Sequence, residues 1–238
     1  MFESAELGHE IDKATYKDEV PKLREALLDA QFELADKKPF PVILIVSGVN
    51  GAGKGDTVNT LNFWMDPRNI HAHAMGEPSD EELERPAMWK FWRRLPPRGS
   101  IGIFFGSWYS YPMRAHIEGG KDQDYLDAYL DDFMRFERML AEEGALILKF
   151  WLHLPKNKLK KRLKSLESDK DTKWRVTKRD WQGVDLYDQM LPVAEHVLRR
   201  TSTAHAPWIV VEATDEKYRN LTVGRTLLKA IQGRLKDA

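Results

Sequence analysis

A glycine-rich turn between two patterned segments constrains the fold of this chain more than any other feature. The run VILIVSG, at 42–48, is typical of a buried parallel strand, and a helical pattern begins at Lys54. The turn between them fits the first seven positions of G-x-x-x-x-G-K-[ST], in the strand-to-helix context that this motif requires. The alternative interpretation is an unrelated glycine-rich turn.

The residue types of this turn suit phosphate oxygens. Glycines let backbone N–H groups turn inward around an anion, and the start of a helix adds a partial positive charge. The side chain of Lys54 supplies a mobile cation. We therefore predict a phosphate-binding loop that comprises Gly48, Asn50, Gly51, Ala52, Gly53, Lys54, Gly55 and Asp56.

The eighth position of the motif departs from the pattern. Gly55 stands where Ser or Thr would place a hydroxyl on magnesium, and Thr57 comes two residues later. This departure argues against an ordinary ATPase. The neighbouring Asp56 could hold a metal ion, or it could simply interact favourably with the start of the helix.

Strand-like and helical segments alternate along the chain. We predict strands at 41–48, 101–105, 145–154 and 206–213, and helices up to 38, at 54–65, as one helix within 77–97, at 124–144, at 156–166, before the last strand, and at 221–235. The segment 167–183 is polar and is expected to be mobile. Such alternation predicts an α/β fold with a parallel sheet that is flanked by helices on both faces.

Composition limits the classes of partner. The 238 residues suffice for one large domain, which we expect to span 1–238. Lys plus Arg and Asp plus Glu both number 37, so no overall charge attracts nucleic acid or an anionic membrane. The lack of cysteine fits a reducing compartment, and no secretory leader or membrane-spanning apolar run is seen. We expect a cytoplasmic protein that binds neither nucleic acid nor membrane.

Several motifs occur in a fixed order along nearly the whole chain. They are GVNGAGKG at 48–55, EPSDEE at 77–82, WKFWRRLPP at 89–97, SWY at 107–109, KFWLHLPK at 149–156, KWRVTKRD at 173–180 and APWIVVEATDEKYRNL at 206–221. Together they resemble the polyphosphate kinase 2 family. The resemblance implies a P-loop kinase core with a helical lid, which transfers a phosphoryl group between inorganic polyphosphate and a nucleotide, AMP or ADP, with magnesium as cofactor.

The chain is most similar to the N-terminal copy of polyphosphate:AMP phosphotransferases, which carry two such domains in tandem. In that subfamily the C-terminal copy keeps the full catalytic set. The resemblance therefore implies either a homo-oligomer or fusion to a second homologous domain, with 1–38 as an N-terminal helical extension and about 165–185 as the lid. Whether the chain acts alone is left open at this point.

The resemblance also implies roles for individual residues. Lys54 and Arg93 are expected to be catalytic, and Trp89, Phe91 and Arg93 match a helix that borders the substrate cleft. The cations of the lid are Lys173, Arg175, Lys178 and Arg179.

Other positions depart from the active members of the family, which read FDRSWYNR where this chain reads FFGSWYSY at 104–111. Phe105 replaces a metal-binding aspartate, Gly106 and Tyr111 replace arginines, and Asn50 replaces an aspartate. A phenyl ring cannot coordinate magnesium, and a lost arginine removes charge from the transition state. The metal ligands are thus unknown, and we expect reduced catalytic power.

Three further features have two interpretations each. His71 and His73 alternate as on a strand and could bind a metal, although no third ligand is near in sequence. Trp151, Trp181 and Trp208 could stack on bases, but we expect them to pack in the core. The basic run at 156–164 could guide a polyanion or could form a solvated helix face.

Three functions are therefore considered. The first is a polyphosphate-dependent nucleotide phosphotransferase of reduced activity. The second is a non-catalytic, structural or regulatory phosphate-binding domain of a larger enzyme. The third is an ATP-dependent nucleoside monophosphate kinase, which the extra Gly55 disfavours.

Overall fold

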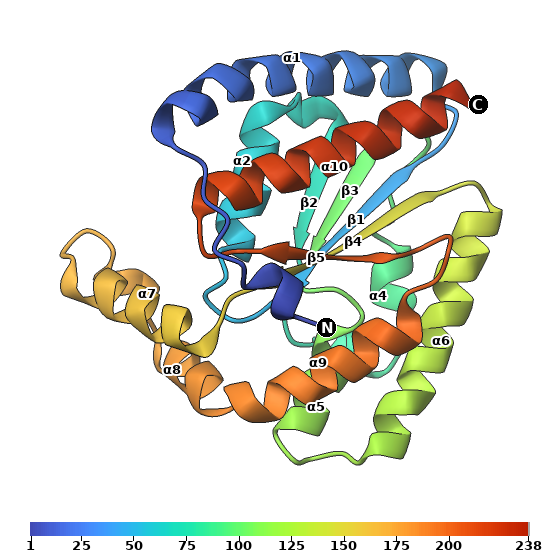
Figure 1. Ribbon diagram of the computed structural model, residues 1–238. Coiled ribbons are helices and arrows are strands. Elements are labelled where there is room, and N and C mark those ends of the chain that lie inside the picture. The colour runs from blue at the N-terminus through green and yellow to red at the C-terminus, as the bar shows by residue number, and fades with distance from the viewer. Residues whose placement is uncertain (238) are drawn as a thin grey trace.

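The computed structural model describes residues 1–237 and contains a five-stranded sheet, in the order β2-β3-β1-β4-β5, whose neighbouring strands are all parallel (Figure 1). The strands are β1 Val42–Gly48, β2 Ile70–Ala74, β3 Ile101–Phe105, β4 Leu146–His153 and β5 Trp208–Glu212. The predicted parallel α/β fold is confirmed. The four predicted strands are present, and β2 is added at one edge.

Helices cover both faces of the sheet. Figure 1 shows α1, α2 and α10 on one side and α5, α6 and α9 on the other, while α7 and α8 project from the body. The longer helices are α1 Lys13–Lys37, α2 Lys54–Trp64, α5 Ser110–Ile117, α6 Gln123–Glu142, α7 Lys156–Ser168, α8 Lys178–Asp185, α9 Tyr187–Thr201 and α10 Glu216–Lys236. The short ones are η1 Glu3–Ala5, η2 Pro67–Asn69, α3 Asp80–Leu83, α4 Trp89–Trp92 and η3 Lys173–Arg175.

The core consists mainly of the strands and the inward faces of these helices. β1 lies at the centre of the sheet, and its first five residues are buried, as expected for a strand with a helix layer on each face. α6 buries Leu126, Leu130, Phe133 and Leu140 at helical spacing, and Asp122 caps its start by accepting a hydrogen bond from Tyr125 N.

The structure corrects two expectations about elements. The single helix within 77–97 is wrong: α3 and α4 are separate four-residue helices, and Pro86, which cannot continue a helical hydrogen-bond ladder, lies between them. The segment 167–183 contains η3 and the start of α8, and its mobility stays a prediction. α10 begins at Glu216, before the predicted 221, because Asp215 caps it by accepting from Tyr218 N.

The N-terminal residues form more than a helix. α1 begins only at Lys13, capped by Asp12, whose carboxylate accepts from the amides of Ala14 and Thr15. The preceding segment contains η1 and is tied to β5, because Gly8 N and His9 N donate to Glu212. Within residues 1–237, no helix is both long and apolar enough to cross a bilayer.

The connections fix where a ligand site can form. The chain leaves β1 toward α2 on one face and leaves β3 toward α5 on the other, and these two strands are neighbours. Ligands of open parallel sheets bind where adjacent strands send their chains to opposite faces, at the carboxyl ends of the strands.

Candidate functional site

The predicted phosphate-binding loop lies at this crossing point, between β1 and α2. Gly53, with φ +83°, precedes the first turn of α2, and a Cβ at this position would overlap the guanidinium of Arg219. A glycine is therefore required by both the backbone conformation and the packing. The strand, turn and helix predicted from the sequence are all present.

Lys54 points back into the loop. Its ammonium donates to the carbonyl oxygens of Gly48, at 3.0 Å, and Val49, at 2.9 Å. Burial lowers the pKa of Lys54 to about 8, and the negative charge of Asp180 partly opposes this shift. The cation nearest the loop is thus held by neutral acceptors and is available to an incoming anion.

Two further arginines bind the outer side of the loop. Arg162, from α7, donates to Gly51 O and to the carbonyls of Ala213 and Thr214, each at 2.9 Å. Arg219, from α10, is buried and donates to Ala52 O at 3.2 Å. These contacts tie the carbonyl oxygens of Gly51 and Ala52 to α7 and α10.

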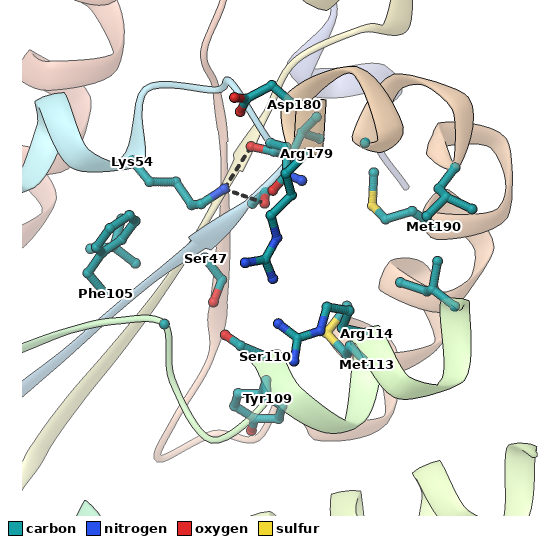
Figure 2. Close-up of a pocket in the computed structure, with 18 of the residues that line it drawn as sticks. Ser47, Lys54, Phe105, Tyr109, Ser110, Met113, Arg114, Arg179, Asp180 and Met190 are labelled. Carbon is teal, nitrogen blue, oxygen red and sulfur yellow. Dashed lines mark hydrogen bonds between the residues drawn. The ribbon is translucent and has the colours of Figure 1, made fainter. Parts of the chain in front are cut away.

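A cavity of 470 Å³ opens beside this loop (Figure 2). Its walls come from the loop, the β3–α5 connection, α5, α8 and the start of α9. The lining residues that the argument uses are Asn50, Lys54, Phe105, Tyr109, Arg114 and Arg179. Figure 2 shows the guanidinium groups of Arg114 and Arg179 directed into the same space as Lys54.

Phe105 forms part of the wall of this cavity, at the carboxyl end of β3. The position that the family resemblance assigns to a metal-binding carboxylate therefore carries a ring in the cavity that contains Lys54. The next residue, Gly106, has φ +78°, and a Cβ there would lie 2.5 Å from Met75 O. A larger residue at this position would require the backbone near Met75 to move.

Two acids, Asp180 and Glu118, line the first cavity. Asp180 accepts from Thr177 N at 2.8 Å in the capping box of α8, and Glu118 Oε1 lies 3.9 Å from Arg114 Nε. The nearby Asp56, outside the lining, pairs with Arg175 at 2.7 Å. Within residues 1–237, no three His, Cys, Asp or Glu side chains are grouped so as to hold a metal ion. The described side chains thus form no cage for magnesium without substrate phosphates, so we assign no step to a metal ion held by the protein alone.

A second cavity, of 400 Å³, adjoins the first. The two share Met75, Gly76, Ser110, Arg114 and Arg179. Glu77 pairs with both arginines and keeps their charges at the junction. The rest of the second lining includes the aromatic side chains of Phe91, Trp108, Tyr111, Tyr129 and Phe133.

Arg114 was not singled out from the sequence. The available indication was an arginine one turn into the helix that follows SWY, at 107–109. The predicted catalytic Arg93 is exposed, packs over the ring of Trp89 at 4.7 Å, and lines neither cavity. The catalytic role of Arg93 therefore remains a prediction, and its position outside both cavities does not support it.

The predicted lid cations are distributed unevenly. Arg179 lines both cavities, and Arg175 reaches the first turn of α2 through Asp56. Lys173 and Lys178 are exposed and outside both linings. The side chain of Asn50 packs against Gly183 of α8, so the lid helix rests on the loop.

The remaining sequence features have structural explanations. Trp151 is buried but also lines the first cavity, so its stacking role stays untested, while Trp181 and Trp208 pack against the core from half-buried positions. His71 and His73 lie on β2 as expected, and no third ligand joins them among residues 1–237. The basic run forms α7, where Leu159 and Leu163 face the core. Its exposed lysines leave both interpretations of the run open.

Comparison with known proteins gives a consistent result. A model of the family "Polyphosphate kinase 2 (PPK2)" matches residues 10–238. The polyphosphate:AMP phosphotransferase of Pseudomonas aeruginosa is 56% identical over 235 residues, which cover 99% of this chain and 47% of that protein. The chain thus spans about half the length of this curated relative.

Two solved structures share the fold. The crystal structure of a polyphosphate kinase 2 from Pseudomonas aeruginosa superposes with a TM-score of 0.89 at 54% identity, covering 99% of this chain and 48% of that one. The polyphosphate kinase 2 from Arthrobacter aurescens superposes with a TM-score of 0.90 at 28% identity, covering 95% and 82%.

Proposed function

Since this chain belongs to the polyphosphate kinase 2 family, we propose that it is a phosphotransferase, of low turnover, acting between inorganic polyphosphate and AMP or ADP. The observation that carries the proposal is the pair of adjoining cavities. Lys54 and the loop amides serve the first, and Arg114 and Arg179 stand between the two. Phosphoryl transfer depends chiefly on such positioning and on neutralising charge.

The two cavities suit two different substrates. The first combines the phosphate-binding loop with Lys54 and suits a chain of phosphates. The second adds aromatic walls, which suit a flat base, with basic groups at its mouth for the nucleotide phosphate. We propose that polyphosphate occupies the first and that AMP or ADP occupies the second, so that the reacting phosphates meet at Arg114 and Arg179.

A second candidate function is phosphate binding without turnover, as one half of a longer protein. Two observations favour it: Phe105 occupies the wall where the family resemblance places a carboxylate, and the chain matches about half of its long relative. In that case the same cavities would bind substrates or regulators. A homologous second domain, fused or associated, would then perform the catalysis.

One assay separates these functions. The purified chain is incubated with long-chain polyphosphate, AMP and Mg²⁺, the cofactor proposed for the family, and ADP is measured, with Lys54→Met as the control. We expect slow ADP formation that the control lacks. No ADP, together with calorimetric binding of tripolyphosphate, would select the binding function. ADP only with ATP as donor would select the nucleoside monophosphate kinase, and no binding at all would overturn the proposal.

A further inference from the structure

A buried ion pair joins the sheet to α6. Lys149 lies on β4, a strand whose other residues apart from His153 are apolar, and Glu137 lies on the inward face of α6. Both side chains are fully buried, and Lys149 Nζ lies 2.7 Å from Glu137 Oε2. Neither residue lines either cavity.

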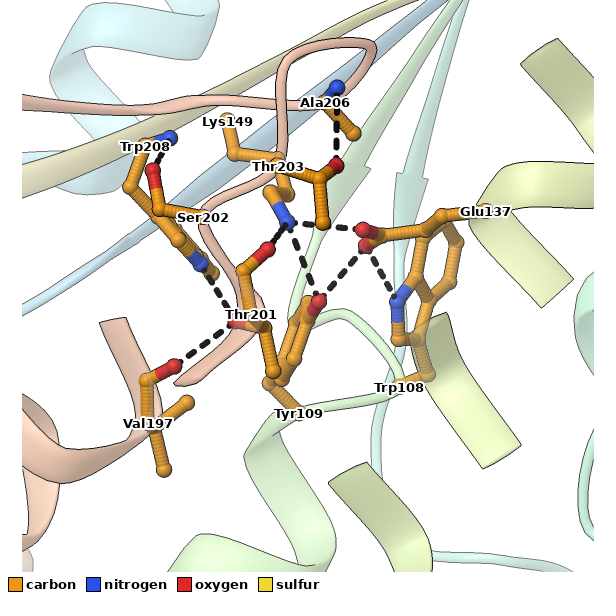
Figure 3. Close-up of polar contacts among 10 residues, drawn as sticks. All are labelled: Trp108, Tyr109, Glu137, Lys149, Val197, Thr201, Ser202, Thr203, Ala206 and Trp208. Atoms are coloured by element: carbon orange, nitrogen blue, oxygen red, sulfur yellow. Dashed lines mark hydrogen bonds and ion pairs between the residues drawn. The ribbon is translucent and has the colours of Figure 1, made fainter. Parts of the chain in front are cut away.

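All three donors of Lys149 are used, and both carboxylate oxygens of Glu137 accept hydrogen bonds (Figure 3). Lys149 Nζ also donates to Thr201 O at 2.8 Å and to the hydroxyl of Tyr109 at 3.2 Å. Glu137 Oε1 accepts from Trp108 Nε1 at 3.0 Å and from the Tyr109 hydroxyl at 2.7 Å. The pair has no free donor for a ligand. Its contribution must therefore come from the side chains that it holds in place.

Stability alone does not account for such a pair. Removing two charges from water is costly, and well-packed apolar residues of the same size often stabilise a core as well or better. An apolar pair, however, could not hold neighbouring polar side chains in fixed orientations through hydrogen bonds. Glu137 fixes two consecutive side chains, Trp108 and Tyr109, in one orientation each.

These two residues belong to the connection that forms the cavity walls. Tyr109 lines the first cavity and Trp108 lines the second. α5 starts at the next residue, Ser110, and carries Arg114 one turn later. The connection begins at Gly106, which has the positive φ of +78°, so its direction is not set by regular strand geometry.

A further contact extends the network to α9. Lys149 binds the carbonyl of Thr201, the last residue of α9, whose hydroxyl accepts from Trp208 Nε1 at 2.8 Å. The rings of Tyr109 and Trp208 lie 5.3 and 5.1 Å from the ammonium. α9 also contributes Met190 to the first cavity. One buried charge pair thus contacts elements on both sides of that cavity.

We infer that Glu137 and Lys149 are positioning residues, which hold the connection 106–109 and the first turn of α5 so that Arg114 stays at the junction of the two cavities. The ligand named below rests on the proposed function, whereas the positioning itself does not. A purely structural pair would affect stability without affecting the order of this segment in a folded protein.

The test replaces the pair without leaving a lone buried charge. In the variant Glu137→Leu/Lys149→Met, we expect a folded protein with a lower melting temperature, because Trp108 Nε1, the Tyr109 hydroxyl and Thr201 O lose buried partners. Amide exchange over 106–117 should be at least tenfold faster, and tripolyphosphate should bind at least fivefold more weakly by calorimetry. The variant Glu137→Gln/Lys149→Met keeps a neutral acceptor for Trp108 and Tyr109, and it should restore most of the protection.

A matched control removes a buried carboxylate elsewhere. Glu212→Gln on β5 lies outside both cavity linings and should leave exchange over 106–117 unchanged. Wild-type exchange and affinity in the Leu/Met variant would overturn the inference. If that variant does not fold, Tyr109→Phe decides by the same exchange measurement, because only the shared hydroxyl is lost. If the wild type does not bind tripolyphosphate, the proposed function fails. The amide-exchange measurement over 106–117 would still test the positioning role of Glu137 and Lys149.

Discussion

Lys54 illustrates how single residues set the chemistry of the site. Its ammonium has only neutral carbonyl partners within hydrogen-bond distance, and burial lowers its pKa to about 8. An anion that enters the loop would interact most strongly with the protonated form. The charge of this residue is therefore expected to change with pH close to the physiological range.

The pH dependence of binding follows from this pKa. Because Lys54 is protonated below about pH 8, its attraction for an anion is complete there and is lost as the pH rises through that value. We expect the affinity for tripolyphosphate to fall by up to about tenfold per pH unit above pH 8. Calorimetry from pH 6.5 to 9.5 measures this. Lys54→Met should bind tripolyphosphate weakly, with a pH dependence that reflects only the titration of the ligand. If the affinity depended on pH equally in both proteins, Lys54 would not be the titrating group.

Phe105 is the residue expected to limit turnover, because its ring replaces an oxygen ligand in the cavity wall. Phe105→Asp should raise Mg²⁺-dependent ADP formation from polyphosphate and AMP by about tenfold or more. Gly106 is left unchanged, since a Cβ there would lie 2.5 Å from Met75 O. Phe105→Asn is the neutral control. Equal rates in the two variants would mean that a missing carboxylate is not the defect.

At the scale of elements, an exposed ion pair joins the lid to the phosphate-binding loop, in addition to the packing of Asn50 against Gly183. Arg175, in η3, binds Asp56, in the first turn of α2, and both side chains are about two-fifths exposed, at 41% and 39%. Such a pair contributes at most about 1 kcal/mol to stability. It nevertheless occupies a lid cation that a phosphate chain would otherwise attract.

This competition can be measured with two single variants. Asp56→Asn should free Arg175 and raise the affinity for tripolyphosphate about threefold, whereas Arg175→Ala should lower it, with both melting temperatures within about 2 °C of the wild type. Calorimetry and thermal unfolding give the two quantities. Lys173→Ala, an exposed lid cation without a carboxylate partner at salt-bridge distance among residues 1–237, is the control. Weaker binding by Asp56→Asn would show that Asp56 contributes to the site.

Some sequence patterns within these elements could have predicted more of the structure. Lys149 interrupts an apolar strand, and Glu137 occupies an inward position of α6 between Phe133 and Leu140. A charge at a core position of each element indicates that the two pair, although nothing in the sequence shows that Trp108 and Tyr109 join them. The break between α3 and α4 was likewise indicated by Pro86.

At the scale of the whole molecule, α1 contributes to stability without lining the site. It packs against α10 on the face of the sheet opposite α5, α6 and α9 (Figure 1), and none of its residues lines either cavity. Leu27, on α1, is fully buried in this layer and lines neither cavity. α10, in the same layer, contacts the loop directly through Arg219, so Leu27 represents only the apolar part of this layer.

Leu27→Ala tests this role of α1. We expect a loss of about 2–5 kcal/mol in the free energy of unfolding, from lost apolar contact and the remaining cavity. Urea denaturation measures the loss, and calorimetry at a temperature where the variant is folded should give an unchanged affinity for tripolyphosphate. The exposed Phe32→Ala, on the same helix, is the control and should be close to neutral in both measurements. A changed affinity in Leu27→Ala would mean that this layer also shapes the loop.

The sequence by itself determined the parallel α/β fold and the phosphate-binding loop, because both follow from residue types at fixed local spacing. That Phe105 stands in place of a carboxylate is implied by the family resemblance. Only the tertiary structure decided which basic side chains lie at the cavities and at the phosphate-binding loop. Arg114 and Arg179 reach the cavities while Arg93 does not, and Arg162 and Arg219 bind the loop from distant helices. The physical reason is that helix packing sets the direction of a long side chain, and contacts across more than a hundred residues leave no mark in local periodicity.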